Sequence, residues 1–307
     1  MLRTWNYRWW KPLVGILIVG VGMIVVAPIV LLPVLAIGVG LEGGPFWESF
    51  QDAATMTAVG PTSLLYLNLT LGSSILVTWF VMRVIHRMRP RWLSSVQPRL
   101  RWRFLFACLG LSVLALGAQL VLGQFLPDTG TDVTTTPNDF TATTAAMALV
   151  VLLTTPLQAA GEEYVFRGYL MQAFGSWFGN KWVALVATAT LFALAHGAQN
   201  FPLFFDRLMF GLIAGWLVIR TGGLEAGIAL HVLNNFLAFG YALAFADVTE
   251  TLTATEAGWM NIPLTLTQSI LYAVLVLWAA RRFGLRTRTR VPAALQGEPA
   301  VSVLTTR

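Results

Sequence analysis

Charged side chains are scarce in this sequence. Only 11% of its 307 residues are charged, compared with about 25% in a typical soluble domain. Hydrophobic residues make up 56% of the chain, and the mean hydropathy is +0.69. So few charges cannot cover the surface of a soluble domain of this size, although they can serve the loops of a membrane bundle. The composition therefore argues against a water-soluble enzyme.

The sequence also lacks most of the common signatures of catalysis. Its one cysteine, Cys108, can form neither an intramolecular disulfide nor a zinc–thiolate site, and its apolar neighbours argue against a nucleophile. There is no H-E-x-x-H, G-x-G-x-x-G or Walker motif. The net charge of +6 is spread along the chain in a way that does not indicate a nucleic-acid partner.

Long apolar runs are what the sequence has in their place. A bilayer has a hydrocarbon core roughly 30 Å thick, which about 20 helical residues cross. Runs of suitable length lie at residues 13–39, 61–82, 104–126, 141–160, 182–200, 203–219, 223–246 and 262–280. They predict an all-α, polytopic membrane helical bundle of about eight transmembrane helices, the first of which is retained rather than cleaved as a signal peptide.

The charges between these runs alternate. Basic residues precede the first run, follow the last, and are concentrated as seven arginines between residues 83 and 103. The other loops carry acidic residues instead. Because loops retained in the cytoplasm are enriched in Lys and Arg, both termini are expected to be cytoplasmic. Arginine supplies 18 of the 20 basic residues, which hints at a GC-rich genome, so we expect a multi-pass protein of a bacterial plasma membrane.

Four regions follow from this organisation. Residues 1–140 form N-terminal transmembrane helices and loops, residues 141–246 a core of four helices, and residues 247–284 the last transmembrane helix with its preceding loop. Residues 285–307 are expected to be a mobile cytoplasmic tail.

A cluster of ionisable residues ends the fourth run. Such residues cost about 2.5–3.5 kcal/mol each to insert, so they usually serve a pathway or a reaction. Glu163 and Arg167 are four residues apart and are expected to pair on one helical face. Glu162 is rotated about 100° from Glu163 and is free for chemistry. An interfacial ion pair would need only one carboxylate, so the second favours a functional site. We expect the helix to continue to about Phe174, which moves Glu162 toward the middle of the bilayer.

Two of the three histidines also lie in apolar runs. His196 follows Phe192 by four residues, and His231 lies one turn before Asn235 on the same helical face. Either histidine alone could simply hydrogen-bond two helices together. Together with a spare carboxylate, however, the two imidazoles and the amide supply a base for water, groups that orient it, and donors for an oxyanion.

These three motifs, Glu162-Glu163-x-x-x-Arg167, Phe192-x-x-x-His196 and His231-x-x-x-Asn235, resemble the signature of the CAAX protease and bacteriocin-processing (Abi or CPBP) intramembrane proteases. The resemblance covers roughly residues 140–245. It implies an all-helical membrane endopeptidase that cleaves a membrane-associated peptide or protein substrate within the lipid bilayer. The eukaryotic relatives trim prenylated C-terminal tails, and the bacterial ones process or protect against small peptides.

The resemblance also implies a role for each residue. Glu162 would activate water with help from His196, while His231 and Asn235 would stabilise the oxyanion or hold a metal. Glu163 and Arg167 would organise the site. Glu162, His196 and His231 match a catalytic zinc set, yet the same groups can also work without a metal, so zinc and no cofactor both stay open. A non-catalytic membrane binding or bacteriocin-immunity protein is the alternative function, and a transporter is a third; the oligomeric state is unknown.

Overall fold

A computed structural model describes residues 2–4, 6–126 and 136–289, and these form a helical bundle. In this part of the chain no strand is present, and a single bridge between Ser95 and Gly223 is the one β pairing. The predicted all-helical membrane fold is confirmed. Most of the predicted tail, from residue 290 onward, and the acidic loop residues Asp128 and Asp132 lie outside the described residues.

The N-terminal half contains three long helical rods. The first runs through α1 (Trp10–Val21), the π-helical segment η1 (Gly22–Val26) and α2 (Ala27–Glu42). After the short helix α3 (Phe46–Thr55), α4 (Pro61–Gly72) and α5 (Ser74–Val84) form the second rod. The short 3-10 helix η2 (Pro90–Leu93) leads to α6 (Trp102–Gly123), which is the third.

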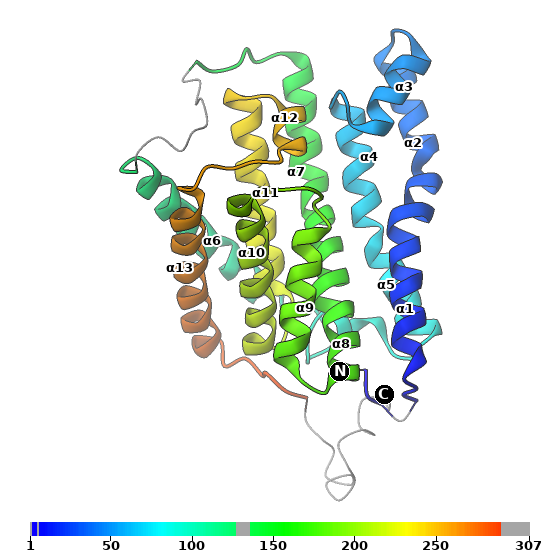
Figure 1. Ribbon diagram of the computed structural model, residues 1–307, viewed down its shortest axis with the longest axis vertical. Helices are drawn as coiled ribbons and strands as arrows, with labels where there is room; N and C mark the ends of the chain where they lie inside the picture. Colours follow the sequence, from blue (N-terminus) through cyan, green and yellow to red (C-terminus); the bar gives the residue numbers. More distant parts are fainter. Residues whose placement is uncertain (1, 5, 127–135, 290–307) are drawn as a thin grey trace, which may run out of the picture.

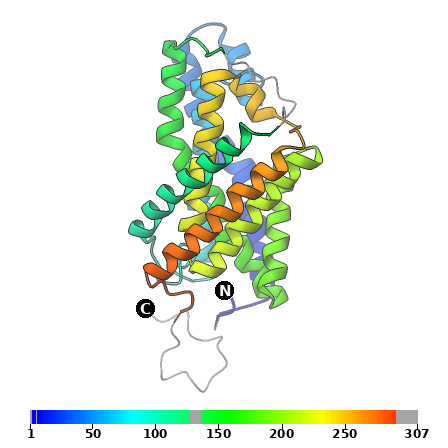
Figure 2. The same ribbon diagram turned by 90° about the vertical axis from the view of Figure 1, so that its left-hand side faces the viewer.

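The C-terminal half carries the site. One continuous rod consists of α7 (Ala142–Glu163), the π-helical segment η3 (Tyr164–Leu170) and α8 (Met171–Phe178). It is followed by α9 (Lys181–Leu194), α10 (Phe201–Thr221), α11 (Glu225–Phe245), α12 (Val248–Thr253) and α13 (Asn261–Arg282). Figure 2 shows α6 and α13 lying side by side, tilted with respect to α7 and α11.

The rod from Ala142 to Phe178 has 37 residues, so it is about 55 Å long at 1.5 Å per residue. The predicted extension of the fourth helix is thus confirmed. Thr141 starts the rod because its hydroxyl accepts a hydrogen bond from the amide of Thr144 (3.2 Å). Glu162 lies near the middle of the rod, two residues before the π-helical segment, and such segments often occur at functional sites.

The number of spans differs from the prediction of eight. Among the described residues, seven helices are long and apolar enough to cross a membrane, and α9 is a shorter apolar helix of 14 residues. At about 21 Å it is too short for a hydrocarbon core of roughly 30 Å. The predicted run extends to residue 200, but the helix ends at Leu194, and Gly197 adopts a left-handed backbone conformation (φ +83°).

Because α9 is short, the turn at residues 195–200 lies well below the upper ends of α7 and α11 (Figure 1). The segment after α12 covers this turn. The Asn200 amide donates to the carbonyl of Thr255 (2.8 Å), and its side chain donates to that of Ala257 (2.9 Å). The turn is therefore fastened to that segment, although residues 195–198, which include His196, are exposed.

The start of α1 and the end of α13 lie at the same end of the molecule (Figure 1). The Arg-rich segment reaches this end too, since the Val96 amide donates to the carbonyl of Gly222 between α10 and α11 (2.8 Å). This arrangement agrees with the charge pattern of the loops. The cytoplasmic location of this end stays a prediction.

Candidate functional site

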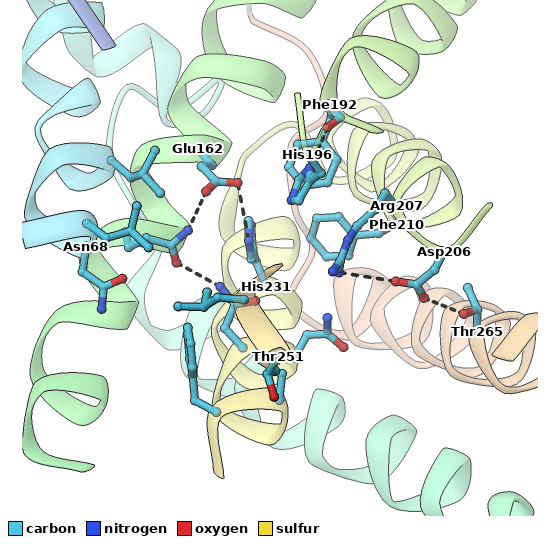
Figure 3. Close-up of a pocket in the computed structure, with 18 of the residues that line it drawn as sticks. Asn68, Glu162, Phe192, His196, Asp206, Arg207, Phe210, His231, Thr251 and Thr265 are labelled. Carbon is cyan, nitrogen blue, oxygen red and sulfur yellow. Dashed lines mark hydrogen bonds and ion pairs between the residues drawn. The ribbon is translucent and has the colours of Figure 1, made fainter. Parts of the chain in front are cut away.

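A cavity of about 220 Å³ lies between α4, α7, α10, α11, α12 and α13 and the end of α9. Glu162, His196, His231 and Asn235 all line it, so the structure brings together four of the six predicted site residues (Figure 3). Glu163 and Arg167 do not line it and are buried beside it. The three sequence motifs thus meet around one cavity.

The Glu162 carboxylate is presented to the cavity by the middle of the long rod. Its Oε1 accepts a hydrogen bond from Nε2 of Gln158, one turn earlier on α7 (2.5 Å). Its Oε2 lies 3.8 Å from Nε2 of His231. One oxygen is therefore fixed by an amide, and the other faces the cavity and an imidazole.

Glu163 and Arg167 form an ion pair in the apolar interior. Arg167 Nη1 is 2.8 Å from Glu163 Oε1, and the side chains are 2% and 0% exposed. The pairing predicted from their spacing is confirmed. The guanidinium also lies over the rings of Phe192 (4.2 Å) and Phe210 (5.0 Å), where cation–π attraction compensates for part of its lost hydration.

The same carboxylate holds His231. Glu163 Oε1 accepts a hydrogen bond from Nδ1 of His231 (3.0 Å), which leaves Nε2 directed toward Glu162. A carboxylate behind an imidazole fixes its tautomer and stabilises its protonated form. Arg167, Glu163 and His231 thus form a chain of polar contacts that ends in the cavity.

One turn after His231, the Asn235 side chain donates to Oε1 of Gln158 (2.9 Å). Gln158 therefore connects Asn235 on α11 to Glu162 on α7. Because a side-chain amide carries two N–H groups, Asn235 retains one donor beyond this bond.

His196 approaches from the opposite wall of the cavity (Figure 3). Its Nδ1 bonds the backbone carbonyl of Phe192 (2.8 Å). A carbonyl only accepts, so the proton is on Nδ1, and the unprotonated Nε2 is an acceptor. Both imidazoles therefore use Nδ1 for positioning and keep Nε2 for chemistry.

The predicted zinc ligands were Glu162, His196 and His231. In the described part of the chain, no three His, Cys, Asp or Glu side chains converge closely enough to hold one ion. This donor arrangement does not fit an ion bound jointly by the three residues. Zinc at this site stays a prediction without geometric support.

Several polar residues of the cavity were missed by sequence reasoning. Gln158 could have been found as a polar residue one turn before Glu162 in an apolar run. Asp206 and Arg207 at the start of α10 form an ion pair (3.5 Å), and Asp206 accepts from the Thr265 hydroxyl (2.5 Å). No spacing rule relates Asp206 to α13, so only the fold could show this contact.

The comparisons with known proteins agree with the motifs. Residues 142–237 match the family described as "Type II CAAX prenyl endopeptidase Rce1-like". The chain is also 24% identical over 212 residues to the "Uncharacterized protein YyaK" of Bacillus subtilis (strain 168), which covers 65% of this chain and 70% of that protein. No solved structure matches significantly. The matched segment contains all six predicted site residues, so the resemblance of this part of the chain to the CAAX-type membrane proteases is confirmed.

Proposed function

We propose that this protein is an intramembrane endopeptidase that hydrolyses a peptide bond of a membrane-associated peptide or protein, with Glu162 as the base that activates water. The observation that carries the proposal is one cavity, deep in the bundle, lined by Glu162, two imidazoles with available Nε2 atoms, and the Asn235 amide. These groups supply the roles that amide hydrolysis requires.

In the first step, water donates one hydrogen toward Glu162 and the other toward Nε2 of His196. Its lone pair is then directed at the substrate carbonyl carbon. Glu162 takes the proton as the new C–O bond forms, which gives a tetrahedral oxyanion. When the C–N bond breaks, Glu162 returns that proton to the leaving nitrogen, so the products are a carboxyl end and an amine.

The oxyanion needs hydrogen-bond donors. Asn235 offers its remaining N–H, and protonated His231 offers Nε2–H. Glu163 contacts His231 from the Nδ1 side, and Arg167 in turn pairs with Glu163. Because these donors are already held in place, they need little rearrangement when negative charge develops on the oxyanion.

The test is cleavage of a peptide tethered to a membrane, with purified protein in water labelled with heavy oxygen. The proposal predicts two fragments, the new carboxyl end carrying heavy oxygen, and loss of cleavage in His196→Ala of equal folded yield. Tight binding of the peptide without cleavage would instead favour the alternative, a non-catalytic binding or bacteriocin-immunity protein on this scaffold.

The cofactor question has its own measurement. Since the described side chains do not form a three-ligand set, we expect full activity after exhaustive chelation, with substoichiometric metal by elemental analysis. Activity lost on chelation and restored by added zinc would contradict the glutamate-only mechanism.

We also propose that the protein resides in a bacterial plasma membrane, as its multi-pass helices and its Bacillus relative suggest. Substrate would then reach the cavity laterally from the bilayer or from the cytoplasmic face.

A further inference from the structure

A second cavity, of about 380 Å³, lies at the end of the bundle where α13 ends. It is formed by the start of α9, the end of α10, the end of α13 and the segment after it. Among the described residues that line it, none is acidic and four are cationic: Lys181, Arg220, Arg281 and Arg288. Within the part of the chain that the structure describes, none of the four pairs with a carboxylate.

An apolar groove of about 420 Å³ continues from this basic cavity toward the middle of the bundle. The helices α9, α10 and α13 each contribute to the basic cavity and to the apolar groove. Lys181 and Leu185 lie one turn apart on α9, and Arg220 and Trp216 lie one turn apart on α10. On α13, Leu277 lines both spaces. The groove is lined entirely by apolar side chains: Leu185, Leu212, Ile213, Trp216, Ile270, Ala273, Val274 and Leu277.

Aromatic residues place the junction of the two spaces at the edge of the bilayer. The Arg220 guanidinium lies 5.8 Å from the Trp216 ring, and the Lys181 ammonium lies 5.1 Å from that of Trp182. Trp beside basic residues is typical of the interface between lipid and water. The cations are therefore at headgroup level, and the groove is at acyl-chain level.

We propose that this composite site binds one anionic phospholipid, with its phosphate among the four cations and an acyl chain along the groove. Charge complementarity selects an anion, since four cations line the cavity and, in the part of the chain that the structure describes, no carboxylate lines it or pairs with them. The continuous groove selects a lipid over a free anion. Basic cavities between transmembrane helices are suited to such headgroups.

The site lies apart from the proteolytic cavity, and the two share no lining residue. It nevertheless uses α9 and α10, and His196 lies in the turn that connects them. A bound lipid would therefore join the outer ends of the helices that position one wall of the active site.

Native mass spectrometry of the full-length protein with added phosphatidylglycerol or phosphatidylcholine of identical chains tests this site. The wild type should retain phosphatidylglycerol preferentially. Arg220→Gln combined with Arg281→Gln should weaken its binding by about 30-fold, since each basic residue contributes about 1 kcal/mol. The control removes two exposed arginines of the Arg-rich loop, Arg89→Gln with Arg91→Gln, and should change nothing.

Two further measurements distinguish a bound phospholipid from a free phosphate ion. Excess inorganic phosphate should not displace the lipid, and Val274→Trp, an exposed position that fills the groove, should weaken lipid binding without affecting folding. The proposal is overturned if the two double variants lose the same amount of phosphatidylglycerol binding, or if the wild type retains both lipids equally. It is also overturned if phosphate displaces the lipid and Val274→Trp leaves lipid binding unchanged.

Discussion

Gln158 is a second link between α7 and α11, beside the contact of Glu163 with His231. Its amide nitrogen donates to Glu162, and its oxygen accepts from Asn235. It therefore positions both the proposed base and one proposed oxyanion donor. No other side chain in the described residues bonds to both of them.

Replacing Gln158 with Leu should lower kcat about 10- to 100-fold while the protein still folds, because a hydrogen bond to a charged group contributes about 1.5–3 kcal/mol. The measurement is cleavage of the tethered peptide, with Gln124→Leu at the exposed end of α6 as control. A Gln158→Leu enzyme as fast as the control would show that the amide has no positioning role.

At this scale the sequence predicted contacts within one helix and missed those between helices. Helical geometry alone placed Glu163 beside Arg167, because residues four apart share a face. The contact of Glu163 with His231 joins residues 68 positions apart, and it depends on how α7 packs against α11. The family resemblance indicated that the motifs belong together, but not that Glu163 contacts His231.

The close packing of α7 and α11 depends on a glycine. A Cβ atom on Gly227 would lie 2.7 Å from Oε2 of Glu163, which is closer than such atoms approach in proteins. Glu163 cannot move freely, because Arg167 and His231 hold its other oxygen. The absence of a side chain at Gly227 thus keeps the carboxylate in place behind the imidazole.

Gly227→Ala should therefore reduce cleavage and thermal stability, since it displaces Glu163 from His231. Gly240→Ala, on the same helix with no neighbouring atom within 4 Å of its would-be Cβ, is the matched control and should leave both unchanged or slightly raise stability. Equal behaviour of the two variants in peptide cleavage would refute the positioning of Glu163 by this contact.

Hydropathy predicted the long helical rod through Glu162 but not the end of α9. The long rod through Glu162 was expected because the apolar pattern continued past the charged cluster, and it extends to Phe178. The end of α9 was placed too late, since the predicted run extends to residue 200 although three of the six side chains at 195–200 are polar (His196, Gln199 and Asn200). Gly197 and the capping residue Asn200 end one helix and start the next, which hydropathy does not measure.

For the molecule as a whole, His86 couples folding to pH. It lies outside the spans, just after α5, is 4% exposed, and shares a hydrogen bond with the Tyr169 hydroxyl (3.0 Å). Burial, aided by the positive charge of Lys11, lowers the pKa of His86 from 6.5 to about 4. The folded protein therefore favours neutral His86, and the unfolded chain takes up a proton first as the pH falls.

Unfolding free energy should consequently decrease as the pH falls from about 6.5 toward 4, by about 2 kcal/mol between pH 7.5 and pH 5 from this group alone. Denaturant titration in detergent micelles measures the decrease, and His86→Gln should remove that part of it. An identical pH dependence in wild type and His86→Gln would show that His86 is not responsible.

The central claim is that Glu162, held near the middle of a membrane bundle, is the base that activates the water molecule for hydrolysis of the substrate. The most direct measurement is kcat/KM for a membrane-tethered peptide, wild type against Glu162→Gln at equal folded yield. The variant keeps the shape of the side chain but cannot accept the proton of water. We predict a loss of at least about 100-fold, the lower range for removal of a general base. A Glu162→Gln enzyme with the rate of the wild type would contradict the account.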